Sequence, residues 1–267
     1  MEAKLEDRAR RVADLTRELR SLSGEYQALE LDTHRLEQVV MGLPVTRFRE
    51  LPPEALRLNV GTRTTRANFL FQGHGSAALV RSVFGDDPGF PVLDWGCGSG
   101  RTLNWLHPVG SWARWWHGCD VDRAAIAWLN AQGIANARPC ADEPPLPYED
   151  GFFGQVFSFS VLTHIDPPKH PLWYAELRRV MRPGGRALLT VQGDAIIAAK
   201  RVTGAEHLAH YEAHGWVHVE REGHYKSASL ISARLAQQMA SEFFEIEDYQ
   251  PGGYNKLMDR FIVRKPA

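Results

Sequence analysis

Apolar residues recur at the spacing of a heptad repeat through residues 1–41, and this spacing predicts one long amphipathic helix. Its two apolar rows hold Leu5, Val12, Leu19, Tyr26 and Val40, and Leu15, Leu22, Leu29 and Leu36. Arg8 and Thr33 are the only polar residues in those rows. A seam of this kind is typical of a coiled coil. We therefore expect a coiled-coil helix, with an amphipathic helix packed on its own domain as the alternative.

The rest of the chain divides into two further parts. Gly42 and Pro44 end the first helix, and Leu51-Pro52-Pro53 marks a linker. We expect residues 42–84 to hold this linker and more helices, and residues 85–267 to form the main domain.

The most informative segment of the main domain is residues 92–101, which read Val-Leu-Asp-Trp-Gly-Cys-Gly-Ser-Gly-Arg. An apolar run followed by alternating glycines predicts a strand that enters a tight turn before a helix. Gly96, Gly98 and Gly100 are able to adopt positive φ and to let a ligand approach the backbone, where the free N–H groups of the helix face it. We therefore expect a nucleotide-like ligand at this turn.

The same segment differs from the dinucleotide fingerprint G-x-G-x-x-G. Arg101 stands where that pattern has Gly or Ala. Asp94 places a negative charge where it repels a pyrophosphate but attracts an amine or a hydroxyl. Both features favour a ligand without phosphates.

The turn resembles the D-x-G-x-G-x-G loop of the class I S-adenosylmethionine-dependent methyltransferases, and further segments of residues 85–267 match that family in order. The resemblance implies an α/β fold with a Rossmann-like, doubly wound, seven-stranded sheet whose last strand is antiparallel. It places later strands at residues 117–122, 153–162, 186–191 and 259–264. Gly154 and Gln155 stand where many members carry an Asp, at a position that usually packs structurally.

The resemblance also implies S-adenosylmethionine as the cofactor. In the family pattern, Asp120 accepts both ribose hydroxyls and Asp142 meets the exocyclic amine of adenine. The expected cofactor-binding residues are Asp94, Gly96, Cys97, Gly98, Gly100, Asp120, Val121, Ala141, Asp142, Glu143 and Phe159.

A narrower likeness concerns the acceptor of the methyl group. Residues 160–165, 173–180 and 189–193 resemble a group of methyltransferases that accompany glycosyltransferases in pathways for surface polysaccharides or sugar-bearing natural products. This likeness implies a small-molecule acceptor that contains a sugar.

Two segments are expected to cover the bound ligands. Helices in residues 54–84 are predicted to form a lid that excludes water, or else to supply ordinary core aromatics with a helix-end glycine. The lid contacts are Phe69, Phe71, Gly73, His74 and Gly75. Residues 194–242 are predicted to roof the acceptor pocket, because aromatic rings stack on sugar or aromatic faces. The relevant side chains there are Tyr211, Trp216, His224 and Tyr225.

Methyl transfer to a hydroxyl requires removal of its proton, and His164 is our first candidate for the base. It follows the fourth predicted strand, at the carboxyl edge where open α/β sheets bind ligands. Asp166 is placed to hold its ring, and His224 and Tyr225 are further catalytic candidates. A His164 that caps the next helix or bonds a carbonyl is the alternative.

Three histidines with helical spacing, His207, His210 and His214, raise the alternative of a metal site. Gly215 breaks the run, and no nearby Cys or carboxylate is obviously placed to complete the shell. We therefore expect no metal.

The composition narrows the partners of this chain. Its formal net charge is −1 and no basic stripe is interleaved with aromatics, so we expect no nucleic-acid partner. No apolar stretch is long enough to span a membrane, and charges from Glu2 onward argue against a secretory signal, so we expect a cytoplasmic protein with no membrane partner. Cys97, Cys119 and Cys140 are expected to be packing residues at strand ends.

The sequence therefore predicts an S-adenosylmethionine-dependent enzyme that O-methylates a sugar or a glycosylated metabolite. N- or C-methylation of another small metabolite and a catalytically silent cofactor-binding scaffold are the alternatives. The apolar seam of residues 1–41 predicts a homodimer, with a slight preference for antiparallel helices.

Overall fold

The computed structural model describes residues 50–58, 65–85, 89–106, 115–198, 204–220 and 227–267. The predicted coiled coil of residues 1–41 lies outside these ranges, as do His224 and Tyr225. Within the described ranges, no helix combines the length and the apolar character needed to cross a membrane.

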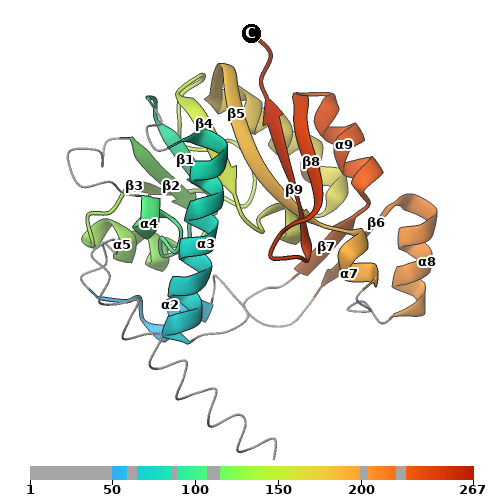
Figure 1. Ribbon diagram of the computed structural model, residues 1–267, viewed down its shortest axis with the longest axis horizontal. Helices are drawn as coiled ribbons and strands as arrows, with labels where there is room; N and C mark the ends of the chain where they lie inside the picture. Colours follow the sequence, from blue (N-terminus) through green and yellow to red (C-terminus); the bar gives the residue numbers. More distant parts are fainter. Residues whose placement is uncertain (1–49, 59–64, 86–88, 107–114, 199–203, 221–226) are drawn as a thin grey trace, which may run out of the picture.

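The centre of the molecule is a seven-stranded sheet with the strand order β3-β2-β1-β4-β5-β9-β8 (Figure 1). The first five strands in that order are parallel, and β9 is antiparallel to both of its neighbours. Their bounds are β1 Val92–Trp95, β2 Trp116–Asp120, β3 Asn136–Pro139, β4 Phe153–Ser158, β5 Met181–Gln192, β8 Glu245–Tyr254 and β9 Met258–Arg264. The prediction of a Rossmann-like seven-stranded sheet with an antiparallel last strand is confirmed.

The helices lie around this sheet, and a separate antiparallel pair of strands forms a second, small sheet. The helices are α2 Glu54–Leu58, α3 Arg66–Phe84, α4 Leu103–Leu106, α5 Arg123–Ala131, α6 His170–Val180, α7 Asp194–Ala198, α8 Ala205–His214 and α9 Ala233–Ser241. Two 3₁₀ helices, η2 Leu162–His164 and η3 Pro167–Lys169, precede α6, and the small sheet pairs β6 Trp216–Glu220 with β7 Ser227–Ile231.

Alternate residues of the central strands face two different cores. Val92 of β1 packs with residues of α3 and α5. Leu93, the next residue, packs with residues of α6 and α9. Successive side chains of a strand point to opposite faces, so the sheet is covered on both sides.

Three predicted strand limits differ from the structure. The fourth strand ends at Ser158 rather than 162, because Ser160 has a φ of 68° and the chain then turns into η2. The second strand ends at Asp120 because Asp122 caps α5, accepting from the backbone N–H groups of Ala124 and Ala125. The fifth strand already begins at Met181, which pairs with β4 before a register shift.

Helix α3 packs closely against Arg101 and Trp105, just before α4 and within it. A Cβ atom on Gly73 would lie 2.2 Å from the backbone oxygen of Arg101, so this glycine permits a close approach. Gly73 is therefore a contact in the middle of a helix and not a flexible point or a helix end. Phe69 is buried in the core, whereas Phe71 is 71% exposed. The lid prediction is not tested by these contacts, but Phe69 contributes to the core as its alternative stated.

We predict that two glycine substitutions in α3 have opposite effects on stability. Gly73→Ala should destabilise the fold by about 1–3 kcal/mol, because the added methyl group overlaps backbone that has no room to move. Gly75→Ala should stabilise it by about 0.5–1 kcal/mol, because a Cβ there meets nothing within 4 Å and alanine favours the helix. Urea unfolding of both variants measures this, and a shift of the same sign in both would contradict the packing described.

Candidate functional site

The glycine-rich loop after β1 has the conformation that its sequence predicts. Gly96, Gly98 and Gly100 have φ values of 81°, 51° and 81°. A Cβ on Gly96 would lie 2.1 Å from the side chain of Val161, and one on Gly100 would lie 2.4 Å from that of Leu129. Both the backbone conformation and the lack of space therefore require glycine at positions 96 and 100.

Cys97, within this loop, is buried in the core. Its Sγ would lie 2.6 Å from a Cβ on Gly118, so the thiol fills the space that the glycine of β2 leaves. Cys119 is buried as well, which agrees with a packing role for both thiols.

Asp120, at the carboxyl end of β2, is fixed by the backbone around it. Its Oδ2 accepts from Gly98 N at 2.8 Å, and its Oδ1 accepts from Asp122 N at 2.9 Å. Burial raises the pKa of Asp120, while these two backbone donors act to lower it. Each carboxylate oxygen keeps a second acceptor position, so Asp120 is still able to accept hydrogen bonds from a ligand.

Asp94 adds a second carboxylate to the same region. It is only 4% exposed. Burial, and then the negative charge of Asp120, raise the pKa of Asp94 well above its usual range, while Arg101 acts to lower it. Two neighbouring buried carboxylates favour a ligand that brings positive charge or hydrogen-bond donors.

The other predicted cofactor residues are placed around this pair. Val121, Ala141, Asp142 and Glu143 are exposed and follow the carboxyl ends of β2 and β3. Cys140 N donates to Asp120 O at 3.0 Å, so the segment that leads to Asp142 starts beside Asp120. Phe159 is buried and stacks on Tyr254 with ring centroids 4.6 Å apart.

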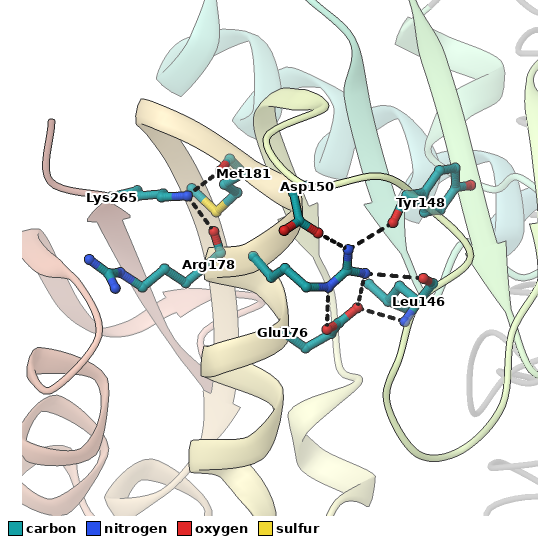
Figure 2. Close-up of polar contacts among 8 residues, drawn as sticks. Leu146, Tyr148, Asp150, Glu176, Arg178, Met181 and Lys265 are labelled. Carbon is teal, nitrogen blue, oxygen red and sulfur yellow. Dashed lines mark hydrogen bonds and ion pairs between the residues drawn. The ribbon is translucent and has the colours of Figure 1, made fainter.

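A partly buried ion pair anchors the loop that follows Asp142 (Figure 2). The Arg179 guanidinium donates to both oxygens of Glu176, at 2.6 and 2.9 Å. It also donates to the carbonyls of Tyr148 at 2.9 Å and Leu146 at 3.2 Å, and to Asp150 at 2.6 Å. Glu176 in turn accepts from Leu146 N at 2.6 Å. Residues 146–150 are thus tied to helix α6.

A second tie joins the same loop to the strand that carries Asp120. The Tyr148 hydroxyl donates to Gly118 O at 2.7 Å. Because Gly118 lies two residues before Asp120 in β2, the loop is held between α6 and β2. No sequence pattern indicated this network, because all its contacts except the Glu176–Arg179 pair join residues about 30 positions apart.

The chain is strained where β4 ends. Ser160 has a positive φ, and its N–H donates to Thr190 Oγ1 at 2.8 Å. Its Oγ lies 2.8 Å from Thr163 Oγ1. Residues other than glycine rarely adopt this conformation, and it persists here because Thr190 of β5 and Thr163 of η2 hold the residue. Val161, the next residue, contacts the glycine loop at Gly96, so the strained turn lies beside that loop.

His164 lies in η2, just after this turn, and its ring is held by β7. Its Nδ1 is 2.8 Å from the carbonyl oxygen of Ser227, and the Ser227 hydroxyl donates to the His164 carbonyl at 2.7 Å. A carbonyl only accepts hydrogen bonds, so Nδ1 carries the proton and the lone pair of the neutral ring is on Nε2. This bond to a carbonyl is the geometry of our alternative, and it also leaves His164 in the tautomer of a base.

We had expected Asp166 to hold the His164 ring, but Asp166 does not bind Nδ1. Its Oδ1 is buried and has no hydrogen-bond partner among the described residues. The reason is topological, because residues 194–242 bring the backbone of Ser227 to the ring. The chain also enters η3 at Pro167, directly after Asp166.

The aromatic residues of the insertion have different surroundings. The Tyr211 hydroxyl donates to Asp194 at 2.7 Å, and Tyr211 is buried in a small core of its own. Burial raises the pKa of Tyr211, so its hydroxyl keeps its proton. Trp216 is half-buried and packs partly against the main core.

The three histidines of α8 are not arranged around one point. The rings of His210 and His214 are 4.4 Å apart, and His210 meets the edge of Trp216 at 4.7 Å. In the described part of the chain, no group of three His, Cys, Asp or Glu residues is placed to hold a metal ion.

Comparisons with known proteins agree with this site. Residues 92–185 match the family model of a methyltransferase domain. A tRNA (carboxymethyluridine(34)-5-O)-methyltransferase of Arabidopsis thaliana is 33% identical over 116 residues, which are 43% of this chain and 26% of the relative. A ubiquinone/menaquinone biosynthesis C-methyltransferase of Burkholderia cenocepacia is 31% identical over 110 residues, which are 38% of this chain and 43% of the relative. The chain thus spans less than half the length of these relatives.

The fold itself is found in solved structures. An S-adenosylmethionine-dependent methyltransferase from Mesorhizobium loti superposes with a TM-score of 0.54 at 16% identity, over 72% of this chain and 100% of that structure. Residues 92–185 are therefore similar to a methyltransferase domain, the fold is that of a solved S-adenosylmethionine-dependent methyltransferase, and S-adenosylmethionine is the cofactor that these comparisons support. The residues fit this cofactor, because a glycine-rich loop adjoins the buried Asp94 and the half-buried Asp120, whose carboxylates suit its positive charges and hydroxyls.

We predict that the buried ion pair under the 146–150 loop is far more important for stability than a surface pair. Arg179→Met should cost about 3 kcal/mol, since it leaves Glu176, with a 6% exposed side chain, without its charged partner. Arg264→Met is the control, because Arg264 and Glu245 are 43% and 51% exposed, and should cost under about 1 kcal/mol. Denaturant unfolding measures both, and equal losses would show that the loop does not depend on the pair.

Proposed function

We propose that the protein transfers the methyl group of S-adenosylmethionine to a hydroxyl group of a sugar or a glycosylated metabolite. The observation that supports this most directly is the bond from His164 Nδ1 to Ser227 O, because it leaves Nε2 as a base. A hydroxyl acceptor needs such a base, whereas a neutral amine carries its own lone pair.

In this proposal, Asp120 accepts the ribose hydroxyls of the cofactor, and Asp142 accepts from its adenine amine. The glycine loop and Asp94 hold the part that bears positive charge. The bound cofactor supplies an electrophilic methyl group. The protein then orients the acceptor hydroxyl in line with that group, and His164 Nε2 takes the proton.

The alternatives differ in what they require of the site. N- or C-methylation of another small metabolite is supported by the similarity to the Burkholderia C-methyltransferase. A catalytically silent scaffold would bind the cofactor and transfer nothing.

The proposal is tested by supplying S-adenosylmethionine with free sugars, nucleotide sugars, glycosylated metabolites and matched amines. We expect O-methylated product from a sugar-containing acceptor, identified by mass spectrometry. Asp120→Ala is the control for the cofactor site and should weaken cofactor binding by about 1.5–3 kcal/mol in calorimetry, the range for a charged hydrogen bond. Turnover of amines alone favours the alternative enzyme, and cofactor binding with no product favours the scaffold.

We predict that His164 and Ser227 contribute unequally to turnover. His164→Ala should lower kcat by about 10²- to 10⁴-fold with cofactor affinity unchanged, because the base is lost. Ser227→Ala is the matched control: it keeps the backbone carbonyl that holds Nδ1 and should change kcat little. If His164→Ala is fully active, or loses cofactor binding in parallel, His164 is not the base, and His224 and Tyr225 become the candidates.

We further propose that residues 1–41 form a coiled coil that makes the protein a homodimer with antiparallel helices. Residues 42–84 act as linker and lid, and residues 194–242 cover the acceptor. Nine apolar heptad positions would otherwise face water. Light scattering of the full chain measures the association, and a monomer at micromolar concentration would leave the helix packed on its own domain.

A further inference from the structure

A cavity of about 500 Å³ lies between η3, α8 and β6. Its lining residues are Asp166, Glu206, His207, His210, Trp216, Val217 and His218. We call it the Asp166 cavity. It is distinct from the glycine loop and the Asp94 and Asp120 carboxylates, none of which lines it.

The small sheet connects this cavity to the candidate base. His218 of β6 pairs with Ser229 of β7, and its Nδ1 is 2.8 Å from Ser229 Oγ. Ser227, two residues earlier in β7, holds the His164 ring. Asp166, on the wall of the cavity, follows His164 by two residues. One hairpin thus contacts both the candidate base and the cavity wall.

Apart from its histidines, the cavity wall carries charge of one sign. Asp166 and Glu206 are carboxylates, and none of the lining residues is Lys or Arg. The cavity therefore favours a cation over an anion, and a cation over a neutral molecule of the same shape.

Two buried polar atoms on the wall lack partners. Asp166 Oδ1 and His210 Nε2 are both buried, and the described part of the chain supplies neither with a hydrogen bond. A buried carboxylate oxygen without a donor is costly, and a ligand that donates to it removes that cost. An ammonium group offers three donors together with a positive charge, and the indole of Trp216 adds a wall that attracts cations.

We propose that the Asp166 cavity binds a protonated amine of the methyl acceptor, which makes the acceptor an amino sugar or another hydroxyl compound with an ammonium group. This inference rests on the proposed function, because it names the chemical class of that acceptor. The hydroxyl that reacts lies at His164, and the ammonium group lies at Asp166 and Glu206.

The test measures binding to the full-length protein with S-adenosylmethionine present, so that it does not depend on turnover. Two matched pairs of probes differ only in charge: glucosamine against glucose, and cyclohexylamine against cyclohexanol. We expect each amine to bind about tenfold more tightly than its alcohol, as a charge-assisted hydrogen bond provides.

Variants then locate the effect. Glu206→Gln and Asp166→Asn should each reduce the preference for the amine, while Glu212→Gln should not. Glu212 is an exposed carboxylate on the same helix that does not line the cavity. The Glu206 and Glu212 substitutions are chemically identical and both lie at exposed positions, so a failure to fold does not explain a difference between them.

Three results would overturn the inference: equal binding of amine and alcohol, an amine preference that survives Glu206→Gln and Asp166→Asn, or stoichiometric zinc binding that displaces the amines. The proposed function fails separately. If no sugar hydroxyl is methylated but cyclohexylamine still binds in preference to cyclohexanol, the cavity is an amine site and the sugar acceptor is wrong.

Discussion

The hydrogen bond from Gly98 N to the Asp120 carboxylate joins the two strands on which the site depends. It connects the loop after β1 to the end of β2, and it requires a loop with no side chain between them. The positive φ values of the loop glycines and the burial of Cys97 against Gly118 follow from the same close approach. Once this corner is closed, the carboxylates of Asp94 and Asp120 share one buried region, and its charge selects the kind of ligand that fits.

Local sequence predicted the strand and the glycine turn of this corner, because both follow from neighbouring side chains and backbone preferences. The place of Asp120 came from the family resemblance, and the capping role of Asp122 was not predicted. Apart from β1, the strands of the sheet were implied by the family resemblance, including the antiparallel β9, which pairs with β5 over its whole length. The family resemblance supplied the strand order, which no local pattern contains.

The contacts that the sequence did not predict join residues far apart in the chain. His164 and Ser227 are separated by 63 positions, and Leu146 and Glu176 by 30. In such pairs each residue type is common, and only the folded topology decides which partner it meets. Asp166 was assigned to the His164 ring because it is adjacent in sequence, yet the insertion brings a backbone carbonyl to that place instead. Gly73 was assigned to the lid, and its close contact with the backbone of Arg101 was not predicted, because Arg101 comes from another part of the chain.

Residues 194–242 thus contact the candidate base through their backbone, at the carbonyl of Ser227. Because Ser227 O accepts from Nδ1, a backbone carbonyl and not the Asp166 carboxylate orients this side of the His164 ring. Asp166 is thereby left with an unpartnered oxygen on the wall of a separate cavity. A carbonyl that orients the His164 ring and a carboxylate on the wall of the cavity both lie beside one hairpin, β6 with β7. The position of this hairpin thus sets both the orientation of that ring and one wall of the Asp166 cavity.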